Sequence, residues 1–166
     1  MFGNAPLRPD SQMIAKALAV LRIVTGLLFL QHGTGKILGI PMSSMAFPPQ
    51  WTLFWVAGWI ELIGSLLLIV GLATRPVAFL LAGEMAIAYW LIHAPESFFP
   101  IINRGETAIL FCFIFLLFVA TGPGTWSADE ALLKRRDADG EADVHGYVGL
   151  GGERQYRPED LGDRTI

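Results

Sequence analysis

Four apolar segments follow one another along the first 128 residues, separated by short stretches rich in proline and glycine. They cover about 13–31, 52–72, 75–93 and 106–121. A bilayer core takes about 20 mostly apolar residues per helix, a length that all four approach, the last being the shortest. Backbone groups in lipid must be paired within the spanning segment, and the alternation typical of membrane β-barrels is missing here. The pattern therefore predicts an all-α fold, a four-transmembrane-helix bundle.

The charged residues are divided unevenly between this apolar body and the C-terminal tail. Of the 166 residues, 53% are hydrophobic and 16% are charged, whereas about 25% are charged in an ordinary soluble domain. Of the 12 basic and 15 acidic residues, 16 lie in the last 38 positions. We therefore expect a cytoplasmic segment over 1–12, a membrane domain over 13–128 and a largely disordered cytoplasmic tail over 129–166. The alternative for the tail is a docking segment for a partner protein.

Several classes of function are disfavoured by composition alone. The net charge of −3 and the lack of a large basic patch argue against nucleic-acid binding. A single cysteine, Cys112, allows neither an intramolecular disulfide nor a Cys-pair redox centre. The sequence has no HxxxH or ExxH spacing that would support a metal site in a helix bundle.

Lysine and arginine in the flanks of the segments predict the orientation, because cytoplasmic flanks carry an excess of these residues. One side holds Arg8, Lys16, Arg75 and the cluster Lys134-Arg135-Arg136, and the other holds Lys36 and Arg104. We therefore expect a multi-pass protein of the cell (inner) membrane with both termini in the cytoplasm. Of the two longer outer loops, about 31–51 and 94–105, the second carries Phe98, Phe99, Ile101 and Ile102. This predicts a loop that lies on or re-enters the membrane surface.

Three charged residues fall near the middle of the apolar segments: Arg22, Glu61 and Glu84. A charge at the centre of a membrane helix costs at least about 2.5–3.5 kcal/mol on insertion scales and usually faces a partner inside the bundle. At 1.5 Å per residue, all three lie roughly 13–16 Å from the inner ends of their helices, and so near one level. We expect Arg22 to pair with at least one glutamate, while the other shares the guanidinium or stays protonated. Either a polar staple that fixes helix register or a proton-handling or head-group-binding site would explain such a triad.

A second group of ionisable residues lies toward the outer ends of the helices: His32, Lys36, His93 and Glu106. His32 and Lys36 share a face if the first helix continues that far. The group predicts a shared ligand site at a pocket mouth, with contacts to lipid head groups or helix capping as the alternative. Glu84 and His93 are nine positions apart, about 180° round a straight helix, so the two groups are expected to form separate sites.

Short motifs occur in a recognisable order along this body. They are Arg22-x3-Gly26, Gln31-His32-Gly33-x2-Lys36, Glu61-x2-Gly64, Gly71-Leu72-x-Thr74-Arg75, Gly83-Glu84-Met85-x2-Ala88-Tyr89, His93, Glu106 and Gly122-Pro123-Gly124-x2-Ser127. The set resembles the DoxX/DoxD-like family of integral membrane proteins over about 14–133. The resemblance implies a four-helix bundle linked to membrane redox chemistry, including sulfur-compound oxidation coupled to quinone and oxidative-stress complexes.

The resemblance also implies a site and a function. The candidate catalytic residues are Arg22, Glu61 and Glu84, and the candidate ligand-binding residues are His32, Lys36, His93 and Glu106. The expected function is that of a small subunit of a membrane oxidoreductase system, which binds quinone or a similar small molecule within the bundle and works with soluble or membrane redox partner proteins. A non-catalytic membrane scaffold that anchors partner proteins is the alternative.

Overall fold

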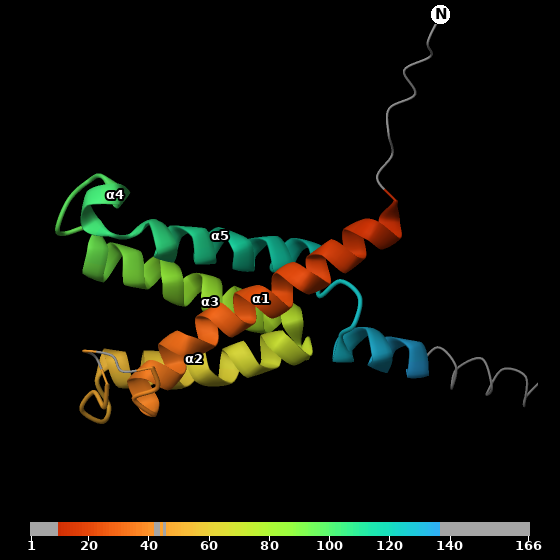
Figure 1. The fold of residues 1–166 in the computed structure, drawn as a ribbon, viewed down its shortest axis with the longest axis horizontal. Coiled ribbons are helices and arrows are strands. Elements are labelled where there is room, and N and C mark those ends of the chain that lie inside the picture. The colour runs from red at the N-terminus through yellow and green to blue at the C-terminus, as the bar shows by residue number, and fades with distance from the viewer. Residues whose placement is uncertain (1–9, 42–43, 45, 137–166) are drawn as a thin grey trace, which may run out of the picture. The chain divides into compact units, whose positions relative to one another are not determined.

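The computed structural model describes residues 10–41, 44 and 46–136, and this part of the chain is helical and contains no strand. Its elements are α1 (Ser11–Ile37), α2 (Leu53–Val70), α3 (Thr74–Ala88), the π-helical turn η1 (Tyr89–His93), α4 (Pro100–Asn103) and α5 (Glu106–Thr121) (Figure 1). Among the described residues, three helical stretches are long and apolar enough to cross a membrane, and α5 is a shorter apolar helix. The predicted all-α class is therefore confirmed, and the structure fits a helical membrane bundle.

The chain divides into two compact units, Met1–Ala131 and Leu132–Ile166. All the elements named above belong to the first unit. Residues 128–131 of the first unit are helical, and so are residues 132–136 of the second. The tail predicted beyond residue 136, like the first nine residues, lies outside the described part of the chain.

The ends of the helices are fixed by local chemistry. The Asp10 carboxylate accepts a hydrogen bond from the Gln12 N–H at 3.0 Å and so caps the start of α1. The hydroxyl of Thr52 does the same for the Trp55 N–H at the start of α2. Gly71 ends α2 with φ 72°, the left-handed conformation that glycine adopts without steric cost.

The helices pack mainly as two pairs, α1 on α2 and α3 on α5, with a smaller contact between α2 and α3. In Figure 1, α3 and α5 lie side by side and α1 runs obliquely to the other helices. The Phe29 ring of α1 contacts the rings of Phe111 and Phe115 of α5 at centroid distances of 5.1 and 5.0 Å. The core therefore joins the two pairs through buried aromatic contacts.

A close backbone approach brings α1 against α2. A Cβ added at Gly33 would lie 2.5 Å from the Leu62 nitrogen, and one at Gly58 would lie 3.0 Å from the Lys36 Cβ. Small residues at both positions let the helices meet at backbone distance. Helix α1 consequently continues through Gly33 to Ile37 and carries Lys36 alongside α2.

The loop between η1 and α5 is organised by Asn103, which is buried. Its amide donates to the Ser97 carbonyl at 2.8 Å, its side-chain oxygen accepts from the Gly105 N–H at 2.8 Å, and its own carbonyl lies 2.8 Å from His93 Nδ1. The loop thus has a fixed shape although Phe98 is 86% exposed and Ile101 is 73% exposed. Contact of these apolar side chains with the membrane surface stays a prediction.

Candidate functional site

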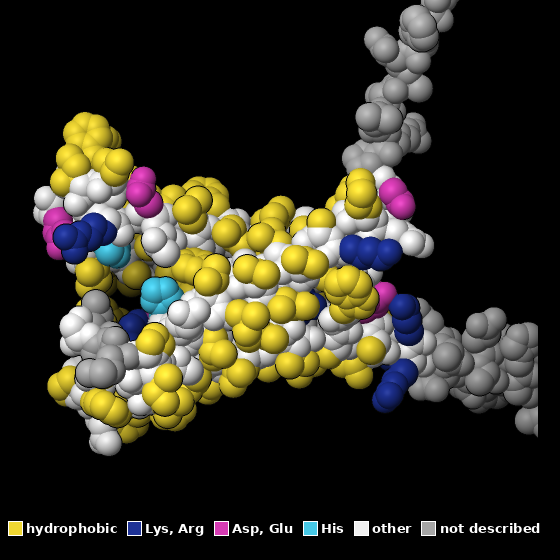
Figure 2. All heavy atoms as spheres, viewed as in Figure 1, with side chains coloured by type: hydrophobic (Ala, Val, Ile, Leu, Met, Phe, Trp, Pro, Cys, Tyr) yellow, Lys and Arg dark blue, Asp and Glu magenta, His cyan; other side chains and the backbone are white. Residues whose placement is uncertain are grey.

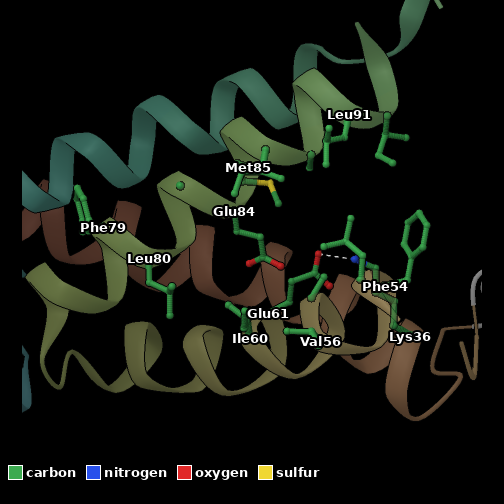
Figure 3. A pocket seen from close by; sticks show the side chains of 16 residues that line it. Lys36, Phe54, Val56, Ile60, Glu61, Phe79, Leu80, Glu84, Met85 and Leu91 are labelled. Carbon is green, nitrogen blue, oxygen red and sulfur yellow. Dashed lines mark hydrogen bonds and ion pairs between the residues drawn. The ribbon is translucent and has the colours of Figure 1, made fainter. Parts of the chain in front are cut away.

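A cleft of about 330 Å³ lies between α2 and α3. Its walls are apolar side chains of these helices and of η1, with Phe54, Ile60, Phe79, Leu80, Met85 and Leu91 among them (Figure 3). Three ionisable side chains also face it, each from a different helix: Lys36 of α1, Glu61 of α2 and Glu84 of α3. The size and apolar lining are typical of a site for a small molecule.

Lys36 and Glu61 form an ion pair in this cleft. The Lys36 Nζ donates to Glu61 Oε1 at 2.6 Å, and the Glu61 side chain is only 3% exposed. The second oxygen of Glu61, Oε2, is buried and has no hydrogen-bond partner within the described part of the chain. The hydroxyl of Ser65, one turn further along α2, donates to the backbone carbonyl of Glu61 and does not compensate this oxygen.

Glu84 faces this ion pair from α3. Figure 3 shows its carboxyl group pointing across the cleft toward Glu61. Both of its oxygens are buried, and neither has a hydrogen-bond partner among the residues that the structure describes. Buried polar groups are almost always hydrogen-bonded, and an unsatisfied one costs about 1–3 kcal/mol. The cleft therefore holds three unsatisfied carboxyl oxygens in an apolar surrounding.

The cleft opens on the apolar outer surface of the bundle. Of its lining residues on α3, Phe79 is 68% exposed and Leu80 is 54% exposed, and Leu53 of α2 is 55% exposed. Gly83 also lines the cleft, and a Cβ added there would meet no atom within 4 Å. The polar groups can thus be reached from the apolar surface of the bundle, between α2 and α3.

The expected ion pair between Arg22 and a glutamate is wrong. Arg22 is fully buried and donates to four backbone carbonyls: Leu68 at 2.6 Å, Ile69 at 2.5 Å, Pro123 at 2.9 Å and Trp126 at 2.9 Å. Two of these carbonyls belong to the last turn of α2, where helical carbonyls lack partners and a cation is favourable. Arg22 therefore fastens the C-terminal end of α2 to the segment that follows α5.

Arg22 does not lie level with the two glutamates, because the helices are not parallel and do not begin at one level. Helix α1 begins at Ser11 and runs obliquely, so its twelfth residue is level with the end of α2. The Ala15 carbonyl in its second turn accepts from the Thr125 N–H at 3.2 Å, which shows how far this end of α1 extends past the other helices. Lys36, predicted to lie in the outer group, takes the place beside Glu61 that was assigned to Arg22.

The structure does not bring the four outer residues together at one site. The imidazole of His32 contacts the Phe29 and Phe111 rings at centroid distances of 5.8 and 6.0 Å. His93 is held by the Asn103 carbonyl, and Glu106 is exposed in the first turn of α5. Figure 2 shows histidine side chains beside a hollow at this end of the bundle. Of the four, Lys36 lies in the cleft and its long side chain reaches inward from the outer part of α1.

The geometry of α3 also differs from a straight helix. Its last turn, η1, is a π-helix, which contains one extra residue per turn and rotates the side chains that follow. His93 consequently turns toward the Asn103 loop, while Leu91 and Ile92 line the cleft. Glu84 and His93 therefore make different contacts, but the expected separation of the two groups is wrong for Lys36, which pairs with Glu61.

Some residues that shape the site were not identified from the sequence. Gly83 has no side chain to occupy the cleft that it lines. The sequence feature that could have indicated this role is a glycine directly before a mid-helix glutamate. Asp129 accepts from the Ala73 and Thr74 N–H groups at 2.7 and 2.8 Å and so caps the start of α3. The capping role of Asp129 could not be predicted from the sequence, because Asp129 lies in the polar tail and caps a helix that begins 55 positions earlier.

Comparisons with known proteins agree with the membrane-bundle architecture. The sequence profile of the family described as DoxX matches residues 17–94. An uncharacterized protein of Haemophilus influenzae is 43% identical over 127 residues, which cover 71% of this chain and 92% of that relative. No solved structure matches the chain.

Proposed function

This chain belongs to the DoxX family and is a membrane protein; from that premise we propose that it binds quinone, or a similar lipid-soluble small molecule, in the cleft between α2 and α3. It would act there as a small subunit of a membrane oxidoreductase system. The observation that carries the proposal is the set of three buried and unsatisfied carboxyl oxygens, on Glu61 and Glu84, facing an apolar cleft. A ligand whose head group donates hydrogen bonds to them, as the reduced form of a quinone does, removes the energetic penalty of leaving them unpaired.

The shape of the cleft supports a ligand with a flat polar head and an apolar tail. A volume of about 330 Å³ lies within the range of small-molecule sites. The exposed apolar edge formed by Phe79, Leu80 and Leu91 gives a hydrocarbon tail a path from the cleft into the bilayer. A quinone head at Glu84 with its isoprenoid tail along α3 has this arrangement.

The chemistry of the cleft fits a molecule that gains or loses protons. Reduction of a quinone to a quinol takes up two electrons and two protons. A redox partner protein would supply the electrons, and the Glu84 carboxyl group and the Lys36–Glu61 pair are positioned to exchange protons with the head group. In this proposal the groups that exchange protons belong to this chain and the electron carrier belongs to the partner.

The proposed membrane topology has α1, α2, α3 with η1, and α5 as four spans with both chain termini in the cytoplasm. The start of α1, the end of α2, the start of α3 and the end of α5 are joined at one end by the contacts of Arg22, Asp129 and Thr125. Lys16 and Arg75 lie at this same end, which supports its assignment to the cytoplasmic side by the excess of positive charge.

Binding is tested by filling the cleft without disturbing the fold. Gly83→Phe adds a ring into open space and replaces a mid-helix glycine, so the protein is expected to fold at least as well as the native chain. The matched control is Leu66→Phe on α2, at a position that is 50% exposed and outside the cleft.

The assay is calorimetric titration of a naphthoquinone with a short prenyl tail into protein held in phosphatidylethanolamine and phosphatidylglycerol nanodiscs. We expect binding by the native protein and by Leu66→Phe, and a loss of at least about tenfold in affinity in Gly83→Phe. No saturable binding of either the naphthoquinone or its hydroquinone by the native protein, or unchanged affinity in Gly83→Phe, would contradict the proposal.

A further inference from the structure

We infer that the cleft selects ligands whose head group donates hydrogen bonds, so that it binds the hydroxyl-bearing reduced form, the quinol, in preference to the quinone. This inference rests on the proposed function and adds the chemical form of the ligand. It follows from the hydrogen-bonding capacity of the three side chains that face the cleft.

The buried cleft atoms without a hydrogen-bond partner in the described part of the chain are carboxyl oxygens. They are Glu61 Oε2 and the two oxygens of Glu84, and all three are buried. Glu61 is ion-paired with Lys36 through its other oxygen, so its free oxygen carries no hydrogen. Glu84 carries at most one hydrogen on its two oxygens. At least two of the three atoms therefore need a donor from the ligand.

A quinone cannot supply these donors, because its two oxygens only accept. It can accept from the Glu84 O–H, if present, or from the remaining N–H groups of Lys36, whose side chain is 14% exposed. Either contact leaves the buried acceptors unpaired. A further bond to Lys36 uses one of its remaining N–H groups and leaves the carboxyl oxygens without a donor.

A quinol has two O–H groups, each of which donates and also accepts. One hydroxyl can donate to Glu61 Oε2 while accepting from the Lys36 ammonium or from a Glu84 O–H. That hydroxyl pairs one of the buried acceptors that a quinone leaves without a donor. A neutral hydroxyl also suits an apolar cleft better than an ammonium group, since no ion has to leave water.

The test compares three ligands that share ring and tail: the prenylated naphthoquinone, its hydroquinone, and the dimethyl ether of that hydroquinone. Affinities are measured anaerobically with the full chain in nanodiscs. One additional satisfied hydrogen bond at a buried acceptor predicts that the hydroquinone binds at least about tenfold more tightly than either of the others. The dimethyl ether separates the effect of donors from that of ring geometry.

The variant Glu84→Gln tests whether Glu84 is responsible for the preference for hydroquinone. The carboxamide adds two N–H donors and keeps one acceptor, so it can donate to a quinone carbonyl. We expect the preference for hydroquinone to shrink to within about threefold in this variant. It should remain at the native value in Glu96→Gln, a matched change at an exposed loop residue outside the cleft.

The outcomes separate this inference from the proposed function. If the quinone or the dimethyl ether binds as tightly as the hydroquinone, the donor preference is wrong although the cleft still binds this ring system. If none of the three binds, the proposed function fails and the inference fails with it. A fourth ligand carries an aminomethyl group in place of the hydroxyls on the same ring. If it binds about tenfold more tightly than the hydroquinone, the ligand head is a cation and the hydroxyl assignment is wrong.

Discussion

Replacement of Arg22 by methionine separates a structural role of this residue from a role in ligand binding. Methionine keeps an unbranched apolar side chain but is shorter than arginine and donates no hydrogen bonds. Arg22 has no exposed surface, and its guanidinium lies at 2.5–2.9 Å from the four carbonyls that it binds. Its loss leaves carbonyls at the end of α2 and in the segment after α5 without their donor. We therefore expect a large loss of stability with little direct effect on the ligand.

The magnitude follows from the number of bonds. A net contribution of about 1 kcal/mol per hydrogen bond gives about 4 kcal/mol for the four donors of Arg22. Arg22→Lys keeps the charge, but an ammonium group does not reproduce the planar fork that reaches carbonyls on two sides. We expect that variant to lose about half as much, roughly 2 kcal/mol.

The assay is reversible unfolding in mixed micelles of mild detergent and sodium dodecyl sulfate, followed by circular dichroism. Lys16→Met is the matched control, because it removes an exposed positive charge from the same helix. This control should stay within about 0.5 kcal/mol of the native protein. A value for Arg22→Met within about 1 kcal/mol of the native protein would refute the structural reasoning. A stable Arg22→Met protein that no longer binds quinone would show that Arg22 takes part in ligand binding.

Three further changes test the packing and the loop. Gly33→Val places a Cβ within 2.5 Å of the Leu62 nitrogen and should destabilise the bundle by about 1–3 kcal/mol in the same assay, whereas Gly83→Val should not. Asp129→Ala removes the cap of α3 and should cost about 1–2 kcal/mol, with faster hydrogen exchange at the Ala73 and Thr74 amides; unchanged exchange would contradict the capping role. Asn103→Ala removes two side-chain hydrogen bonds and should increase the rate of proteolysis within residues 94–105, and equal rates would show that the loop is held by other contacts.

The helical fold could be predicted from the sequence because it depends on local properties of each apolar segment. An apolar segment in lipid must satisfy its backbone internally, so length and hydropathy are enough to predict a helix. Helix α1 extends beyond its predicted end, to Ile37, because tertiary contact at Gly33 outweighs the low helix propensity of glycine.

The arrangement of the site could not be predicted in the same way, because it depends on the angles at which the helices cross. From the sequence, Glu61 and Glu84 are expected in one group and Lys36 in another, whereas the structure places all three in one cleft. An oblique α1 moves Arg22 to the end of α2 and brings Lys36 to Glu61, and no single-helix pattern contains that angle. The π-helical turn η1 and the contact of His93 with the Asn103 carbonyl are likewise not visible in a regular helical pattern.

The most direct test of the central claim is photolabelling with an azido derivative of the prenylated naphthoquinone, followed by mass-spectrometric mapping of the modified peptides. We predict labels on Leu53–Ile60 of α2 and on Phe79–Ile92 of α3 and η1, which excess unlabelled hydroquinone prevents. Gly83→Phe should abolish them, and Leu66→Phe should retain them. Labelling concentrated around His32 and Phe111, or labelling of the cleft that excess ligand does not reduce, would contradict a quinone site between α2 and α3.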